Sequence, residues 1–110
     1  MAPWVYNSGT IDEWAASASD NEHAQTAEAF CRTAEALIDH DCSQRLGSIS
    51  CPAMVTVGSL DICTPERYAR ELVDLIPGAR LHVFDGAGHM PYVEEPDRFT
   101  DVVRGFLATV

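Results

Sequence analysis

The sequence predicts an α/β fold in which a helical segment over residues 1–48 precedes a strand–helix–strand–helix unit over residues 49–110. Residues 22–39 place apolar side chains at steps of three and four, which is the period of an amphipathic helix. Two short apolar runs, 53–58 and 80–84, flank a second helical stripe. A strand, a helix and a strand at this spacing predict a right-handed parallel crossover.

The N-terminal segment is predicted to be helical with a polar break. A short helix is expected over 11–18, with Thr10 as its cap, and a longer one over 22–39. The polar stretch that follows predicts one helical turn over 43–46, and Gly47 ends it.

The second half begins with "AMVTVG" at 53–58, a small and β-branched run typical of a strand buried on both faces of a parallel sheet. In the helix that follows, Thr64 is the expected cap and Pro65 the first helical residue, and a Pro-Gly pair ends it. "RLHVF" is the second strand. A last helix is expected within 94–110, where apolar residues return at helical spacing.

Composition narrows the class of protein. A chain of 110 residues with 46% hydrophobic residues suits one packed domain, and its net charge of −10 argues against nucleic-acid and membrane-surface partners. No apolar run reaches transmembrane length and the N-terminus lacks a signal-peptide pattern, so we expect a cytoplasmic protein. The four cysteines form no C-x-x-C pair, which argues against a zinc knuckle and favours reduced thiols.

The two predicted strands each end in a loop that carries a chemically useful side chain, Asp61 after the first and His89 after the second. Functional loops of parallel sheets lie at the carboxyl ends of the strands, so these side chains are expected to meet. A carboxylate beside an imidazole fixes its tautomer and stabilises the imidazolium. Two alternatives stay open: Asp61 as a cap of the following helix, and His89 as an ordinary surface residue.

The segment over Ile49–Leu107, with "AMVTVGSLD", "IPGARLHVF" and "GAGHMPYVEEP", resembles the C-terminal part of the α/β-hydrolase superfamily. The resemblance implies that the strands are the family's seventh and eighth. It implies that Asp61, in a G-x-x-D loop, is the catalytic acid and that His89, in a G-x-G-H turn, is the catalytic histidine. Residues 1–48 resemble the end of the helical cap. The sequence pattern is similar to that of lactonases, esterases and cofactor-free perhydrolases. This resemblance implies a small ester or lactone substrate and no metal or organic cofactor.

The nucleophile elbow of that superfamily, G-x-S-x-G, is absent from the sequence, because no serine has glycines two positions to either side. Ser59 and Cys63 lie near Asp61 and are candidate substitutes, whereas Asp85 and Glu94 are alternative partners of His89. One hypothesis is therefore the acid-and-histidine part of a serine hydrolase, inactive alone. The other is a non-catalytic, truncated and self-associating remnant that acts as a structural or binding module.

Two strands alone leave bare edges, so the chain is expected to pair with an N-terminal half, to associate with itself, or to be part of a longer protein. A homodimer is the simplest expectation, formed edge to edge or by exchange of the N-terminal helices about the polar link at 39–48. Trp4, Trp14 and Phe30 would contribute apolar area to it.

Overall fold

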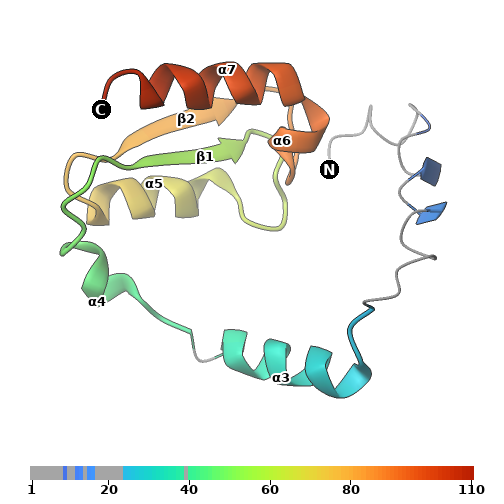
Figure 1. Cartoon of the computed structure of the whole chain (residues 1–110). Coiled ribbons are helices and arrows are strands. Elements are labelled where there is room, and N and C mark those ends of the chain that lie inside the picture. The colour runs from blue at the N-terminus through green and yellow to red at the C-terminus, as the bar shows by residue number, and fades with distance from the viewer. Residues whose placement is uncertain (1–8, 10–11, 14, 17–23, 39) are drawn as a thin grey trace.

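The structure of the protein is a computed structural model that describes residues 9, 12, 13, 15, 16, 24–38 and 40–110. Among the described residues, the elements whose bounds can be given are five helices and two strands (Figure 1). In order they are α3 (Ala27–Ile38), α4 (Ser43–Leu46), β1 (Met54–Gly58), α5 (Glu66–Leu75), β2 (Arg80–Phe84), α6 (Pro91–Glu94) and α7 (Pro96–Leu107).

The two strands form a parallel sheet, as the alternation of strand and helix predicts. Met54 lies opposite Arg80 at one end and Gly58 lies opposite Phe84 at the other. Helix α5 covers one face of this sheet and α7 lies over the other, so the unit has three layers (Figure 1). The loops that leave the carboxyl ends of β1 and β2 therefore start from the same edge.

The core gathers toward this edge of the sheet, and Ile76, just after α5, is buried as well. Phe84, the last residue of β2, is fully buried and stacks on Phe99 of α7 with ring centroids 5.7 Å apart. Val57 of β1, Ala69 of α5 and Ala87 of the second loop are also buried. Burial of one large apolar side chain stabilises a fold by roughly 1.5–3 kcal/mol, so this buried cluster stabilises the end of the sheet from which the two loops leave.

The N-terminal helices differ from the expected ranges. The longer helix starts at Ala27 rather than 22, because the Thr26 hydroxyl accepts a hydrogen bond from the Ala29 N–H (3.2 Å) and so caps it. Residues 22, 23 and 39, and Thr10, Trp4 and Trp14, lie outside the described residues. Of the predicted helix over 11–18, residues 12, 13, 15 and 16 are described, and these are helical.

The second half differs from the expectation at two points, and proline explains one of them. Helix α5 begins at Glu66 with Pro65 as its N-terminal flanking residue, one position later than expected, and Thr64 does not cap it. The predicted last helix is present as α7, and a separate short helix that was not predicted, α6, precedes it. Glu95 lies between them in a non-helical conformation (φ −138°, ψ 63°), because the residue before Pro96 is disfavoured in the helical region.

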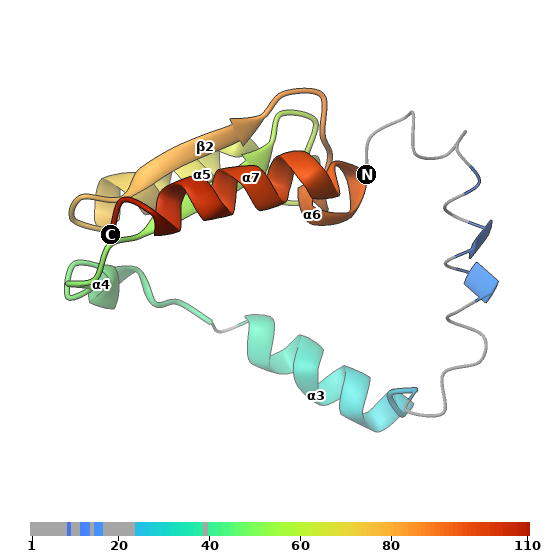
Figure 2. The same cartoon turned by 45° about the horizontal axis from the view of Figure 1, so that its top comes forward.

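Strand β1 and helix α3 are more exposed to solvent than their apolar sequence patterns predict. In β1 only Val57 and Gly58 are buried, whereas the rest of the strand is half-buried. Helix α3 contains no buried residue, and both views show it apart from the α/β unit (Figure 1 and Figure 2). Its apolar side chains Leu37 and Ile38 are 68% and 80% exposed.

In the part of the chain that the structure describes, none of the helices has the length and apolar character needed to cross a bilayer.

Candidate active site

Backbone contacts hold the loops after β1 and β2 against each other. The Leu60 N–H donates to the Ala87 carbonyl oxygen at 2.8 Å, which ties the first loop to the second. At the end of β1, a Cβ atom on Gly58 would lie 2.0 Å from the Gly88 carbonyl oxygen. Only glycine permits so close an approach of two backbones. The relative position of the loops is therefore set by main-chain packing rather than by the functional side chains.

Ser59 connects the same two loops through its side chain. Its hydroxyl donates to Asp85 Oδ1 at 3.3 Å and accepts a hydrogen bond from the Gly86 N–H at 2.9 Å. Gly86 has a φ of +83°, in the left-handed region that favours glycine. Ser59 and Asp85 thus join the two loops to each other, and the carboxylate that bonds to His89 is that of Asp61.

Asp61 is buried and accepts hydrogen bonds on both carboxylate oxygens. Oδ1 accepts from the backbone N–H groups of Cys63 (2.9 Å) and Thr64 (3.0 Å), and Oδ2 accepts from the Thr64 hydroxyl (2.7 Å). Because α5 begins only at Glu66, these contacts brace a turn and do not cap the helix. Burial alone would raise the pKa of Asp61, but the hydrogen bonds from Thr64, His89 and Cys63 outweigh burial and lower it from 3.8 to about 2.

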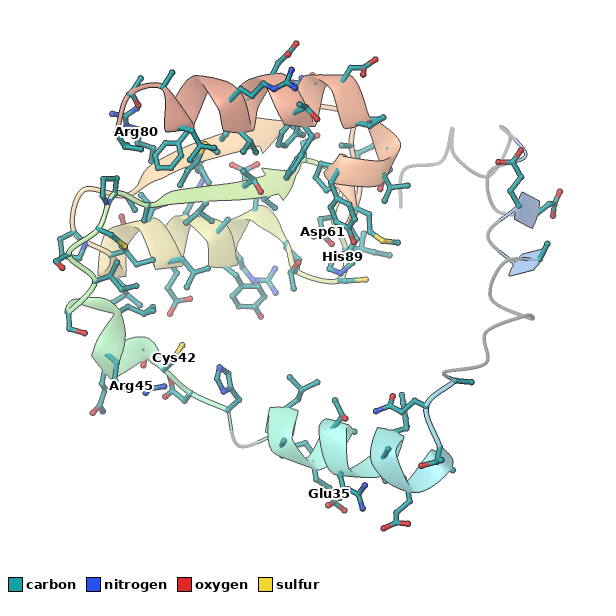
Figure 3. All side chains as sticks on the ribbon, viewed as in Figure 1. Glu35, Cys42, Arg45, Asp61, Arg80 and His89 are labelled. Atoms are coloured by element: carbon teal, nitrogen blue, oxygen red, sulfur yellow. The ribbon has the colours of Figure 1, made fainter. Side chains whose placement is uncertain are left out.

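His89 meets Asp61 at the carboxyl edge of the sheet (Figure 3). Nδ1 of His89 lies 3.0 Å from Asp61 Oδ2, within the distance of about 3.2 Å that a direct hydrogen bond requires. An ionised carboxylate can only accept, so Nδ1 carries the proton and Nε2 of the neutral ring keeps its lone pair. The Thr64 hydroxyl oxygen, 3.4 Å from Nδ1, lies beside this hydrogen bond. The structure thus brings together the two residues that the sequence analysis pairs, whereas their catalytic role stays a prediction.

Glu94 stabilises the loop that carries His89, and Asp61 rather than Glu94 is the carboxylate that bonds to the imidazole. It is 5% exposed, and its carboxylate accepts hydrogen bonds from the N–H groups of Gly88 (2.8 Å) and Met90 (3.1 Å), the two neighbours of His89. The backbone on both sides of the imidazole is therefore held by one side chain. This role was not predicted from the sequence, where the one signal for it is an acidic residue at the end of the otherwise apolar "PYVE".

Thr64 is a second residue whose role was not predicted. Its hydroxyl and its backbone N–H both donate to Asp61, although the sequence pattern assigns it to the cap of α5. An Asp followed three residues later by Thr is a spacing that favours such a local turn, and this was the available signal.

Cys63 completes a group of three potential metal ligands with Asp61 and His89. One ligand atom from each residue lies within 4.8 Å of the others, with Asp61 buried and the other two exposed. Within the described residues this is the one group of three such side chains close enough to share an ion. All four cysteines of the chain are free.

An apolar pocket of about 280 Å³ opens beside the pair. Asp61, His89 and Thr64 line one side of it, and side chains of β1 and α5 line the rest, among them Val57, Ala69 and Leu72. An imidazole with a free lone pair beside an apolar pocket suits proton transfer to or from a bound organic molecule.

Comparisons with known proteins agree with this fold. The family model described as alpha/beta hydrolase fold matches residues 11–96. A proline iminopeptidase from Heyndrickxia coagulans is 38% identical over 74 residues, which are 67% of this chain and 25% of that protein. The chain spans about a quarter of the length of the curated relatives it matches.

Solved structures of hydrolases resemble this chain in the same way. An esterase from Thermogutta terrifontis superposes with a TM-score of 0.61 at 33% identity and covers 63% of this chain and 25% of that one. An enol-lactonase from Burkholderia xenovorans LB400 superposes with a TM-score of 0.68 at 32% identity and covers 74% of this chain and 31% of that one. Since the family model matches well over half of the 110 residues, the chain belongs to the α/β-hydrolase fold family.

Proposed function

We propose that this chain carries the acid and the histidine of a serine-type hydrolase. The observation that supports the proposal is the 3.0 Å contact between the buried Asp61 carboxylate and Nδ1 of His89. In this arrangement Nε2 of His89 takes the proton of a nucleophilic hydroxyl, and Asp61 stabilises the imidazolium that forms. Nε2 then returns the proton to the leaving group.

The serine nucleophile comes from outside these 110 residues, because no serine of the chain lies in a G-x-S-x-G elbow. A further segment or a separate chain would supply it, together with the backbone N–H groups that stabilise the oxyanion. The substrate class that we propose is a small ester or lactone. Similarity to an esterase and to an enol-lactonase at 33% and 32% identity supports this class.

A chimeric enzyme tests the proposal. Residues 49–107 of this chain replace the corresponding C-terminal part of the Burkholderia xenovorans enol-lactonase, which brings its own nucleophile and cap. We expect the folded chimera to hydrolyse a lactone or an activated ester. His89→Ala and Asp61→Asn should each lower kcat on the order of 10³- to 10⁴-fold. The matched control Asp74→Asn, on the exposed surface of α5, should leave kcat unchanged.

Two outcomes would contradict the proposal. One is a chimera that folds, by circular dichroism, but whose activity is insensitive to His89→Ala. The other is a chimera that cleaves only N-terminal proline amides, the substrate class named by the iminopeptidase relatives, and neither esters nor lactones.

The chain alone should hydrolyse an activated ester no faster than its His89→Ala variant. Its sequence contains no elbow, and in this proposal the oxyanion donors also come from outside it; one such donor is often worth a factor of about 100 to 1000 in rate. Activity that disappears in Cys63→Ala would instead show that the exposed thiol near His89 replaces serine.

We further propose that the 110-residue chain is a homodimer and resides in the cytoplasm. Exposed apolar side chains on α3 and the half-buried strand β1 support self-association, and the four free cysteines support a reducing compartment. Sedimentation at micromolar concentration tests the assembly. A folded species of about 12 kDa, the mass of one chain, would contradict it.

A further inference from the structure

The hydrogen bond between Asp61 and His89 has a thiol beside it that the proposed reaction does not use. The Cys63 sulfur, a carboxylate oxygen of Asp61 and a ring nitrogen of His89 lie within 4.8 Å of one another. Thiolate, imidazole and carboxylate are the three side-chain ligands that Zn²⁺ takes in proteins, and a thiolate selects against the harder Mg²⁺ and Ca²⁺.

We propose that Asp61, Cys63 and His89 form a Zn²⁺ site in which the ion takes the place of the proton between the carboxylate and the imidazole. Zinc binding and the Asp61–His89 hydrogen bond are then mutually exclusive. The site is one that this chain forms by itself, without the serine or any other part of a complete hydrolase.

The distances already suit the ion. Two ligands about 2.0–2.1 Å from a tetrahedral Zn²⁺ lie about 3.3 Å apart. Asp61 Oδ2 and His89 Nδ1 are 3.0 Å apart, so they need to separate only slightly. A sulfur and a nitrogen on the same ion lie about 3.6 Å apart, so the Cys63 sulfur, at most 4.8 Å from the other ligand atoms, moves inward by roughly 1.2 Å or less. Its side chain is exposed and has room for this movement.

The surroundings hold the ligands in place. Asp61 Oδ1 accepts two backbone hydrogen bonds, from Cys63 at 2.9 Å and from Thr64 at 3.0 Å, and these hold the carboxylate in its orientation. The first of them also ties the backbone of Cys63 to Asp61. The lone pair of Oδ2 that faces His89 binds the ion, while Oδ2 still accepts from the Thr64 hydroxyl at 2.7 Å. Such outer contacts of a ligand typically contribute 10- to 100-fold to metal affinity. Because two of the three ligands are exposed, a water molecule can take the fourth position.

The proton balance predicts what the ion does to the pair. Zn²⁺ binds the lone pair of Nδ1, so the single proton of the neutral ring moves to Nε2. The thiol proton of Cys63 is released to solvent, and one proton leaves per ion bound. With Nε2 protonated and no lone pair left on the ring, His89 cannot act as a general base. This consequence rests on the proposed function, whereas the binding site does not.

Metal titration of the untagged, purified chain tests the proposal. Co²⁺, a spectroscopic substitute for Zn²⁺, should give a thiolate-to-cobalt charge-transfer band that saturates at one equivalent per chain and disappears when Zn²⁺ is added. Cys63→Ser should abolish the band and weaken Zn²⁺ binding at least about tenfold, measured by competition with a chromophoric chelator. The matched control Cys51→Ser, which changes another exposed free cysteine, should leave both unchanged.

Nitrogen NMR of the His89 ring gives a second measurement that a merely structural role of Cys63 would not change. In the metal-free chain the proton should be on Nδ1, and Zn²⁺ should move it to Nε2. Equal Zn²⁺ affinity in Cys63→Ser and the parent chain, or a proton that stays on Nδ1 at saturating Zn²⁺, would overturn the proposal. Since these readouts need no hydrolysis, an inactive chimera measured with chelator present would contradict the proposed function alone.

Discussion

The buried carboxylate of Asp61 should make the stability of this chain depend on pH in the acid range. Its pKa is about 2 in the folded chain against an ordinary value of 3.8. A lowered pKa in the folded state stabilises the fold above about pH 3.8, and this contribution is lost as the pH falls through about 2. Each pKa unit corresponds to about 1.4 kcal/mol, so the contribution is roughly 2 kcal/mol. The Asp61 side chain is only 4% exposed, but His89 is 45% exposed, so solvent screening reduces the part of this value that comes from the histidine.

The perturbation that isolates this contribution is Asp61→Asn. The amide oxygen can still accept from the backbone of the turn, but the amide nitrogen cannot accept from the Thr64 hydroxyl or from His89. We expect the free energy of unfolding at neutral pH to fall by about 2 kcal/mol. The difference between the parent chain and the variant should then shrink as the pH falls from about 4 to about 2, where the parent loses the same contribution.

Urea unfolding followed by circular dichroism, in the presence of a chelator, measures these free energies at each pH. The control Asp74→Asn changes an exposed carboxylate on α5 and should follow the parent chain at every pH. A difference between Asp61→Asn and the parent that is the same at about pH 6 and about pH 2 would refute the reasoning, because an uncharged cause would then explain the loss.

Three further substitutions test the support of the site by urea unfolding. Gly58→Ala should destabilise the fold by at least about 2 kcal/mol, because the added Cβ would lie 2.0 Å from a backbone oxygen of the histidine loop. The control Gly47→Ala adds a Cβ with no atom within 4 Å and should change stability by less than about 0.5 kcal/mol. Glu94→Gln should cost about 1–3 kcal/mol, since one amide oxygen cannot accept from both backbone N–H groups that Glu94 binds; a neutral result would show that water replaces it. Phe84→Ala should cost about 3–5 kcal/mol because Phe84 is fully buried, and Phe30→Ala, 64% exposed, is its control; equal losses would place the core elsewhere.

Local patterns in the sequence predicted most of the α/β unit. The second strand has the predicted bounds, Arg80–Phe84, and the first differs by one residue. Alternation of strand and helix was enough to predict a parallel pair, and a parallel pair places the loops with Asp61 and His89 at one edge. Boundaries were less well predicted where one side chain decides them, as the Thr26 hydroxyl does at the start of α3.

The sequence by itself determined the fold class, the edge of the sheet where the site lies, and the pair of residues at it, because periodicity and turn residues act over a few neighbouring positions. Only the tertiary structure decided that Glu94 holds the backbone around His89, that Thr64 donates to Asp61 instead of capping α5, and that Cys63 lies within 4.8 Å of both members of the pair. Asp61 and His89 are 28 positions apart in the chain, and their 3.0 Å contact depends on strand register and on the backbone packing of Gly58 against the second loop. Distances of this kind are set by how the two loops pack, which no local pattern of residues encodes.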